Sequence, residues 1–199
     1  MIAVLSGEEF LRQLLASSPA EHVAVVAGIG YAVLVVRRSR WAWVFGAISS
    51  AILAVLAAGA ALPLQAVLQA VYVVMAVYGF WHWSRESGEP VAISVWPWRA
   101  HVLVGVVTAS IAFVAAPWLA ANGAAWPMLD AAVTVVSLLA TWMVARGVLE
   151  NWIYWLVVDA ISFFLYAAQG LAFVAMLYLI YFVIAVFGLR SWHRAWRGL

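Results

Sequence analysis

One carboxylate, Asp159, lies in a long apolar segment on the same helical face as several aromatic and polar side chains. Residues three or four positions apart share a face of an α-helix. The members of this face are Trp152, Trp155, Asp159, Ser162, Tyr166 and Gln169. A carboxylate beside aromatic rings suits a flat organic cation, through charge attraction, stacking and cation–π attraction. The face therefore predicts a binding site for such a cation.

Asp159 is nine residues into its segment, close to mid-depth if the segment crosses a membrane. A carboxylate at that depth must be protonated, paired or directed at water or a ligand. No arginine lies at a comparable depth in any apolar segment, and the chain has no lysine. Two interpretations stay open: a ligand-facing carboxylate, and a neutral one hydrogen-bonded to a nearby Ser or Tyr.

A second polar face runs along residues 127–145, where Asp130, Thr134, Ser137 and Thr141 are spaced by four, three and four. We expect Asp130, Thr134 and Ser137 to line a pathway, together with Ser50 from an earlier segment. Two alternatives remain for this face. Asp130 can instead favour the amino terminus of its own helix, and the hydroxyls can bond to their own helix backbone.

The predicted substrate-binding set draws on three apolar segments. Its residues are Asp159, Trp155, Trp152, Asn151, Gln65, Gln69, Tyr72, Tyr178 and Ser162. We expect no metal, cofactor or catalytic residue. The chain has no cysteine, its four histidines lie near segment ends or in tails without metal-ligand spacing, and it has no hydrolase or metalloprotease motif.

Composition identifies the elements that position these residues. Hydrophobic residues make up 68% of the 199 residues and charged residues 9%, against about 45–50% and about 25% in soluble domains. This excludes a soluble globular protein, a disordered chain and an ordinary nucleic-acid binder. The sequence predicts an all-α membrane protein in the lipid bilayer, with seven spanning helices. We expect them at Pro19–Val36, Trp41–Ala58, Leu64–Trp83, Ala100–Pro117, Pro127–Ala145, Asn151–Ala168 and Leu171–Leu189.

Arginine placement predicts the orientation. Nine of the ten arginines fall on one side of the expected spans, and Arg12 alone falls on the other. Positive residues accumulate on the cytoplasmic side. We therefore expect the N-terminus outside and the C-terminus in the cytoplasm. Residues 1–18 lack the pattern of a signal peptide and are expected to form an interfacial helix.

An internal repeat relates the two halves of the chain. At an offset of 109 residues, positions 43–83 share 14 identities in 41 ungapped pairs, including Trp43 with Trp152 and Gly79 with Gly188. Corresponding spans run in the same direction, as in transporters built from parallel repeats. The expected units are an interfacial segment (1–18), a three-helix bundle (19–83), a linker with the fourth span (84–126) and a second three-helix bundle (127–199).

Several segments resemble the PnuC family, bacterial transporters of nicotinamide riboside. They are Pro127–Ala131, Glu150–Asp159, Leu177–Tyr181, Gly188–Trp192, Gln65–Tyr72 and Tyr78–Trp81. The most specific is the Asn-Trp-x-x-x-Trp run at Asn151–Trp155 followed by Asp159. The resemblance implies two three-helix bundles joined by a linking helix, related to SWEET sugar transporters. The Pro-Gln dipeptide of the sugar branch is absent, which favours the vitamin branch.

The resemblance also implies a function. It indicates a bacterial inner-membrane protein that is not an enzyme and that takes up nicotinamide riboside by facilitated diffusion around a midplane site. Asp159 and Trp155 would then receive the pyridinium, and Gln65, Gln69 and Asn151 would bond the carboxamide or ribose. Thiamine, also a flat cation, is the alternative vitamin, whereas neutral riboflavin fits less well. A proton-coupled carrier, with Asp159 or Asp130 as the proton site, and a membrane scaffold or enzyme are further alternatives. Self-association into a homo-oligomer stays open.

Overall fold

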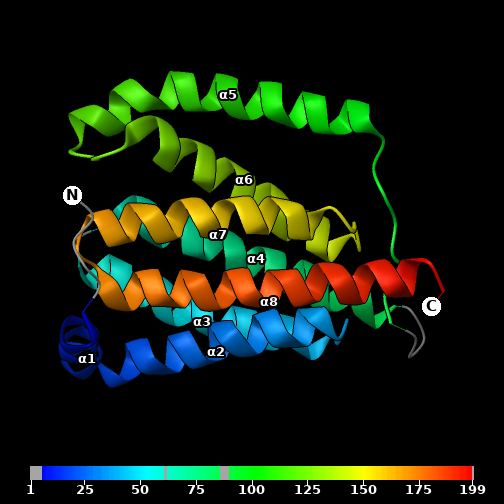
Figure 1. Cartoon of the computed structure of the whole chain (residues 1–199), viewed down its shortest axis with the longest axis horizontal. Helices are drawn as coiled ribbons and strands as arrows, with labels where there is room; N and C mark the ends of the chain where they lie inside the picture. Colours follow the sequence, from blue (N-terminus) through cyan, green and yellow to red (C-terminus); the bar gives the residue numbers. More distant parts are fainter. Residues whose placement is uncertain (1–5, 61, 86–89, 199) are drawn as a thin grey trace.

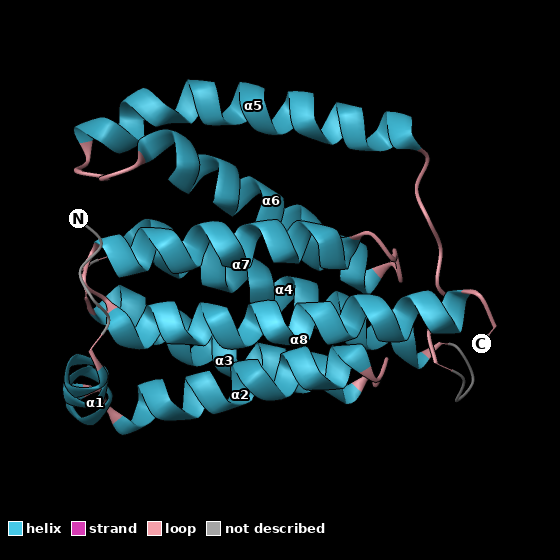
Figure 2. Cartoon of the chain, in the orientation of Figure 1, coloured by secondary structure: helices cyan, strands magenta, loops and turns pink. Residues whose placement is uncertain are grey.

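The computed structural model describes residues 6–60, 62–85 and 90–198, and it is built of helices (Figures 1 and 2). Within these residues there are eight helices: α1 (Gly7–Ala16), α2 (Pro19–Val36), α3 (Trp41–Gly59), α4 (Pro63–Ser84), α5 (Trp98–Ala121), α6 (Pro127–Ala145), α7 (Asn151–Ala168) and α8 (Ala172–Trp196). Residues 1–5, 61, 86–89 and 199, one part of each of the four expected units, lie outside the described residues.

Of the described helices, the seven from α2 to α8 are long and apolar enough to cross a membrane, which confirms the all-α, seven-span prediction. The bounds of α2, α6 and α7 agree with the expected ones. Local chemistry explains the start of α2. The Ser18 hydroxyl accepts a hydrogen bond from the Glu21 backbone N–H at 3.2 Å, and the Glu21 carboxylate accepts one from the Ser18 N–H. This reciprocal cap satisfies two helix donors that otherwise have no partner.

The bounds of α3 and α4 differ from the expected ones by a single residue at one or both ends, whereas α5 and α8 are longer by more than one turn. We expected the fourth span to end at Pro117, but α5 continues through this proline to Ala121. Pro117 cannot donate the N–H bond of its turn, and α5 continues for only about one further turn beyond it. We expected the last span to end at Leu189, but α8 continues to Trp196. Its final turns carry Arg194, and a cation near a helix C-terminus interacts favourably with the helix dipole.

Neighbouring helices pack in two sets (Figure 1). In the first set α3 packs against α2 and α4, and in the second α7 packs against α6 and α8. The sets meet where α2 contacts α8 and where α4 contacts α6, while α5 packs along α6. These contacts bring all helices but α1 and α5 around one centre. The division into two bundles joined by a linker stays a prediction.

The same packing contacts occur in both halves of the chain, between residues related by the 109-residue offset. The rings of Trp43 and Trp83 lie 5.4 Å apart at 83°, and those of Trp152 and Trp192 lie 5.5 Å apart at 85°. Gly79 lies directly against Trp43, as Gly188 does against Trp152, so that a Cβ atom at either glycine would collide with the indole. The matched glycine and tryptophan of the repeat are therefore one packing unit used twice.

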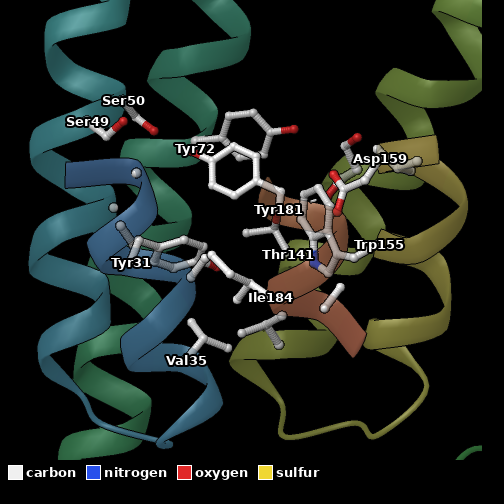
Figure 3. A pocket seen from close by; sticks show the side chains of 18 of the residues that line it. Tyr31, Val35, Ser49, Ser50, Tyr72, Thr141, Trp155, Asp159, Tyr181 and Ile184 are labelled. Carbon is white, nitrogen blue, oxygen red and sulfur yellow. Dashed lines mark hydrogen bonds between the residues drawn. The ribbon is translucent and has the colours of Figure 1, made fainter. Parts of the chain in front are cut away.

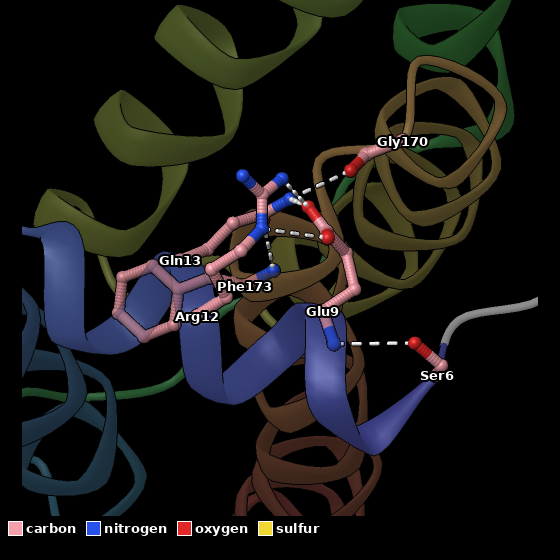
Figure 4. A network of polar contacts seen from close by, with 6 residues as sticks. All are labelled: Ser6, Glu9, Arg12, Gln13, Gly170 and Phe173. Atoms are coloured by element: carbon pink, nitrogen blue, oxygen red, sulfur yellow. Dashed lines mark hydrogen bonds and ion pairs between the residues drawn. The ribbon is translucent and has the colours of Figure 1, made fainter.

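The short helix α1 lies across the end of the helices opposite the C-terminus (Figure 1). Its Gln13 amide donates to the Gly170 carbonyl at 2.8 Å and accepts from the Phe173 N–H at 3.0 Å (Figure 4). The Phe10 ring lies 5.9 Å from that of Phe173. These contacts attach α1 to the turn between α7 and α8, 157 residues away. On its exposed side Arg12 pairs with Glu9, and this hydrogen bond lowers the pKa of the Glu9 carboxyl.

Candidate functional site

A cavity of about 260 Å³ lies at the centre of the helices, lined by residues of α2, α3, α4, α6, α7 and α8 (Figure 3). Both helix sets therefore contribute to its wall. Eight of the predicted site residues line it: Asp159, Trp155, Trp152, Gln69, Tyr72, Tyr178, Ser137 and Ser50. The sequence thus identified residues of five separate helices that the fold brings to one cavity.

Asp159 is the acidic residue of this lining, and its side chain is only 2% exposed. Figure 3 shows it beside Trp155 on one wall, across the cavity from Tyr31, Ser49 and Ser50. Among the described residues Asp159 has no hydrogen-bond or ion-pair partner. The alternative interpretation, a carboxyl group hydrogen-bonded to a nearby Ser or Tyr, is therefore not what the structure shows. The carboxyl group faces the cavity without a protein partner.

Aromatic rings form much of the remaining wall. Tyr178 stacks on Tyr166 with ring centroids 5.3 Å apart, and it contacts Tyr181 edge-on at 6.3 Å. Across the cavity Tyr31 contacts Trp43 edge-on at 5.7 Å. Its hydroxyl is buried and has no hydrogen-bond partner among the described residues. These rings are restrained by each other, so the cavity has preformed walls for a flat molecule.

The prediction did not include Tyr31, Tyr181, Ser49 or Thr141, which also line the cavity. For Tyr181 and Thr141 a signal existed: Tyr181 is the repeat partner of Tyr72, and Thr141 continues the polar face of α6. Nothing comparable marks Tyr31, because the rest of α2 is almost uniformly apolar. Only the packing of α2 against α3 and α8 turns this ring inward.

The cavity-lining hydroxyl groups of α6 donate to backbone carbonyls. Ser137 donates to the Val133 carbonyl at 2.7 Å, and Thr141 donates to the Ser137 carbonyl at 2.8 Å. Each bond stays within α6, as the alternative interpretation of this face allowed. Since their hydrogens are engaged, these oxygens can still accept hydrogen bonds from a ligand.

Five predicted site residues do not line the cavity: Asn151, Gln65, Ser162, Asp130 and Thr134. Asn151 is fully buried at the start of α7 and donates to a backbone carbonyl of the preceding turn at 2.6 Å. Gln65 is exposed in the first turn of α4. Ser162 is buried, and Asp130 and Thr134 are half-buried. Helical spacing identified the correct faces but did not show how far along each helix the cavity extends.

Within the described residues no group of three or more histidine and acidic side chains could hold a metal ion. The chemistry of the cavity is thus that of a carboxyl group, an amide, hydroxyl oxygens and aromatic faces. Such a set can bind and orient an organic molecule by hydrogen bonding, stacking and charge attraction.

Comparisons with known proteins identify the family. The family model described as nicotinamide mononucleotide transporter matches residues 18–194. The chain is 32% identical to the riboflavin/roseoflavin transporter RibM of Streptomyces davaonensis over 166 residues, which are 78% of this chain and 76% of that protein. It is 29% identical to the nicotinamide riboside transporter PnuC of Escherichia coli over 154 residues, 63% of this chain and 64% of that one.

A solved structure shows the same arrangement of helices. The crystal structure of the vitamin B3 transporter PnuC superposes with a TM-score of 0.75 and 25% sequence identity, covering 96% of this chain and 89% of that one. These relatives are membrane transporters and not enzymes. Since the family model spans nearly the whole chain and the fold agrees with it, this chain belongs to the PnuC family of multi-pass membrane vitamin transporters.

Proposed function

We propose that this chain takes up nicotinamide riboside by facilitated diffusion through the central cavity. One observation carries the proposal: Asp159 is buried in the cavity wall and has no partner among the described residues. A charged group inside a membrane protein requires a counter-charge or hydrogen-bond donors. The permanent cation of a pyridinium ring supplies that counter-charge when the substrate binds.

The rest of the cavity wall complements the same molecule. Trp155 lies beside Asp159 and offers an aromatic face to the pyridinium. Gln69 can exchange hydrogen bonds with the carboxamide, and the oxygens of Ser50 and Ser137 can accept them from ribose hydroxyls. Every part of the nucleoside therefore has a chemical counterpart in the wall.

Riboflavin is the second candidate, because RibM, at 32% identity, is a riboflavin/roseoflavin transporter. Riboflavin is neutral and leaves Asp159 without a counter-charge. Thiamine is a cation with flat rings, and it satisfies Asp159 as nicotinamide riboside does. Binding of the two cationic vitamins should therefore depend on the Asp159 carboxylate, whereas binding of riboflavin should not.

Calorimetric titration of the purified protein with each vitamin tests this proposal. We expect the tightest binding for nicotinamide riboside, and we expect Asp159→Asn to weaken it at least about tenfold, equivalent to ~1.4 kcal/mol. The matched control is Asp130→Asn, since Asp130 does not line the cavity. Tight riboflavin binding that Asp159→Asn leaves unchanged would establish the second candidate instead.

The orientation and mechanism belong to the same proposal. With nine of ten arginines on one side, we place that side in the cytoplasm of a bacterium and the N-terminus outside. The two sets of helices would expose the cavity alternately to the two sides by rocking against each other. Net uptake then follows the concentration gradient of the vitamin.

A further inference from the structure

Four tryptophans form a buried layer between the cavity and the arginine-rich ends of the helices. Trp43 and Trp152 line the cavity, and Trp83 and Trp192 lie next to them. The layer is continuous because the rings of Trp83 and Trp192 are 6.4 Å apart. None of the four side chains is more than 4% exposed. On this side the cavity is therefore closed by aromatic rings.

Two hydrogen bonds hold this layer across the boundary between the helix sets. Trp83 of α4 donates from its indole N–H to the Ala145 carbonyl at the end of α6, at 3.0 Å. Trp192 of α8 donates in the same way to the Val35 carbonyl near the end of α2, at 3.1 Å. Each bond thus joins the third span of one set to the first span of the other. The cavity-lining pair Trp43 and Trp152 has no such acceptor among the described residues.

Residues 90–97, which precede α5, reinforce the closure. The Ser94 N–H donates to the Gly147 carbonyl at 2.9 Å, and its carbonyl accepts from the Leu149 N–H at 2.9 Å. The same segment reaches the other helix set, because Arg38 donates to the Val91 carbonyl at 3.3 Å. Arg38 and Gly147 are equivalent positions of the repeat, and both have a positive φ, of 53° and 68°. This segment therefore joins the turn between α2 and α3, which contains Arg38, to the turn between α6 and α7, which contains Gly147.

We infer that Trp83 and Trp192 are the gating residues on the arginine-rich side, and that the cavity opens to that side only when both cross-set hydrogen bonds break. The inference rests on the proposed alternating access. It assigns to this pair a role distinct from substrate contact, because neither residue lines the cavity. A transporter must separate its two helix sets on the side where the substrate leaves. On this side the sets are joined by these two buried bonds, by residues 90–97 and by two more exposed hydrogen bonds, Arg146 to Tyr78 and Ser191 to Val36.

Thiol labelling tests the gate directly, since the chain has no cysteine. The reporter is Ser137→Cys in the cavity, labelled by a membrane-impermeant reagent from the arginine-rich side. We expect Trp83→Phe or Trp192→Phe to accelerate labelling roughly fivefold, and the double variant about twenty-five-fold, because each loses one hydrogen bond but keeps an aromatic ring. Trp126→Phe, at an exposed position near the other end of the molecule, is the control. Unchanged labelling in a double variant that elutes as a single species would overturn the inference.

A second variant tests the same gate with all four tryptophans intact. The Ser191 hydroxyl and the Val36 carbonyl lie 3.5 Å apart across the same boundary. Linking Val36→Cys to Ser191→Cys with a thiol cross-linker should stop transport, and cleaving the link should restore it. Full transport by completely cross-linked protein contradicts the gate. Labelling needs no substrate, so the gate is tested even if nicotinamide riboside fails to bind and the proposed function is wrong.

Discussion

At the scale of single residues, the cavity lining distinguishes buried side chains that are available to a ligand from buried side chains that stabilise the fold. Gln69 and Asn151 are both buried amides, and the sequence placed both in the binding site. Gln69 lines the cavity and has no hydrogen bond among the described residues, whereas Asn151 is bonded to the backbone of its own turn. One amide is available to a substrate and the other is engaged in structure.

This difference predicts opposite effects of two alanine substitutions. Asn151→Ala should lower the free energy of unfolding by about 1 kcal/mol through the lost hydrogen bond, with affinity for the vitamin unchanged. Gln69→Ala should weaken binding and leave the melting temperature close to that of the wild type. Thermal unfolding in detergent and calorimetric titration of both variants measure the two effects. A loss of affinity in Asn151→Ala without a loss of stability would return Asn151 to the binding site.

At the scale of helices, the glycine–tryptophan unit explains why the repeat is visible in the sequence. An indole packed on a helix backbone requires a residue without a side chain at that point, so both members of each pair are fixed. Cavity-lining residues outside this unit can differ between the halves, as Ser50 and Asp159 do. The glycine–tryptophan contacts therefore keep the repeat recognisable in the sequence, although the polar groups that the two halves present to the cavity are different.

The glycine–tryptophan contact predicts an equal loss of stability when its glycine is substituted in either half of the chain. Gly79→Ala and Gly188→Ala should each destabilise the protein by about 1–3 kcal/mol, because the added Cβ atom meets an indole ring in a filled core. Gly105→Ala is the matched control, since a Cβ atom there has open space and alanine favours the helix by up to about 1 kcal/mol. Melting temperatures of the three variants check this. If Gly188→Ala melts like the control, the equivalence of the two contacts is contradicted.

The contact of α1 with the α7–α8 turn gives a further prediction. Gln13→Ala removes the two hydrogen bonds to Gly170 and Phe173, each contributing about 1 kcal/mol. We expect faster hydrogen–deuterium exchange in α1 and at the start of α8, and unchanged exchange in α3. Gln169→Ala is the control, because the exposed Gln169 side chain bonds only within its own helix. Slow exchange of α1 in Gln13→Ala would show that the Phe10 ring contact and the hydrogen bond between His22 and the Leu14 carbonyl hold it without Gln13.

At the scale of the whole molecule, the sequence predicted what depends on local pattern. Hydropathy located all seven spans, and proline or capping residues located the starts of α2 and α6. Helical spacing identified the face that carries Asp159 and Trp155. It could not identify Tyr31, because an isolated tyrosine in an apolar helix is turned inward only by its neighbours. It could not place the tryptophan layer either, since the hydrogen bonds of Trp83 and Trp192 join residues 62 and 157 positions apart.

The last prediction concerns energy coupling, which only the assembled molecule can perform. A proton-coupled carrier needs a carboxyl group that exchanges a proton during each transport cycle. Asp159 and Asp130 are the two candidates, because Glu21, the third acidic residue within the spans, caps the start of α2. If Asp159 instead serves as the counter-charge of a cationic substrate, it stays ionised while the substrate is bound. The proton gradient then supplies no energy for uptake.

We therefore expect labelled nicotinamide riboside to equilibrate across liposomes carrying the purified protein without exceeding its external concentration. An imposed inward proton gradient should not raise the final level, and a protonophore should not lower it. Asp130→Asn should equilibrate at the wild-type rate, because its side chain lies outside the cavity lining. Accumulation above the external concentration that a protonophore abolishes would show proton coupling. Its loss in Asp130→Asn but not in Asp159→Asn would then place the proton site on α6 rather than in the central cavity.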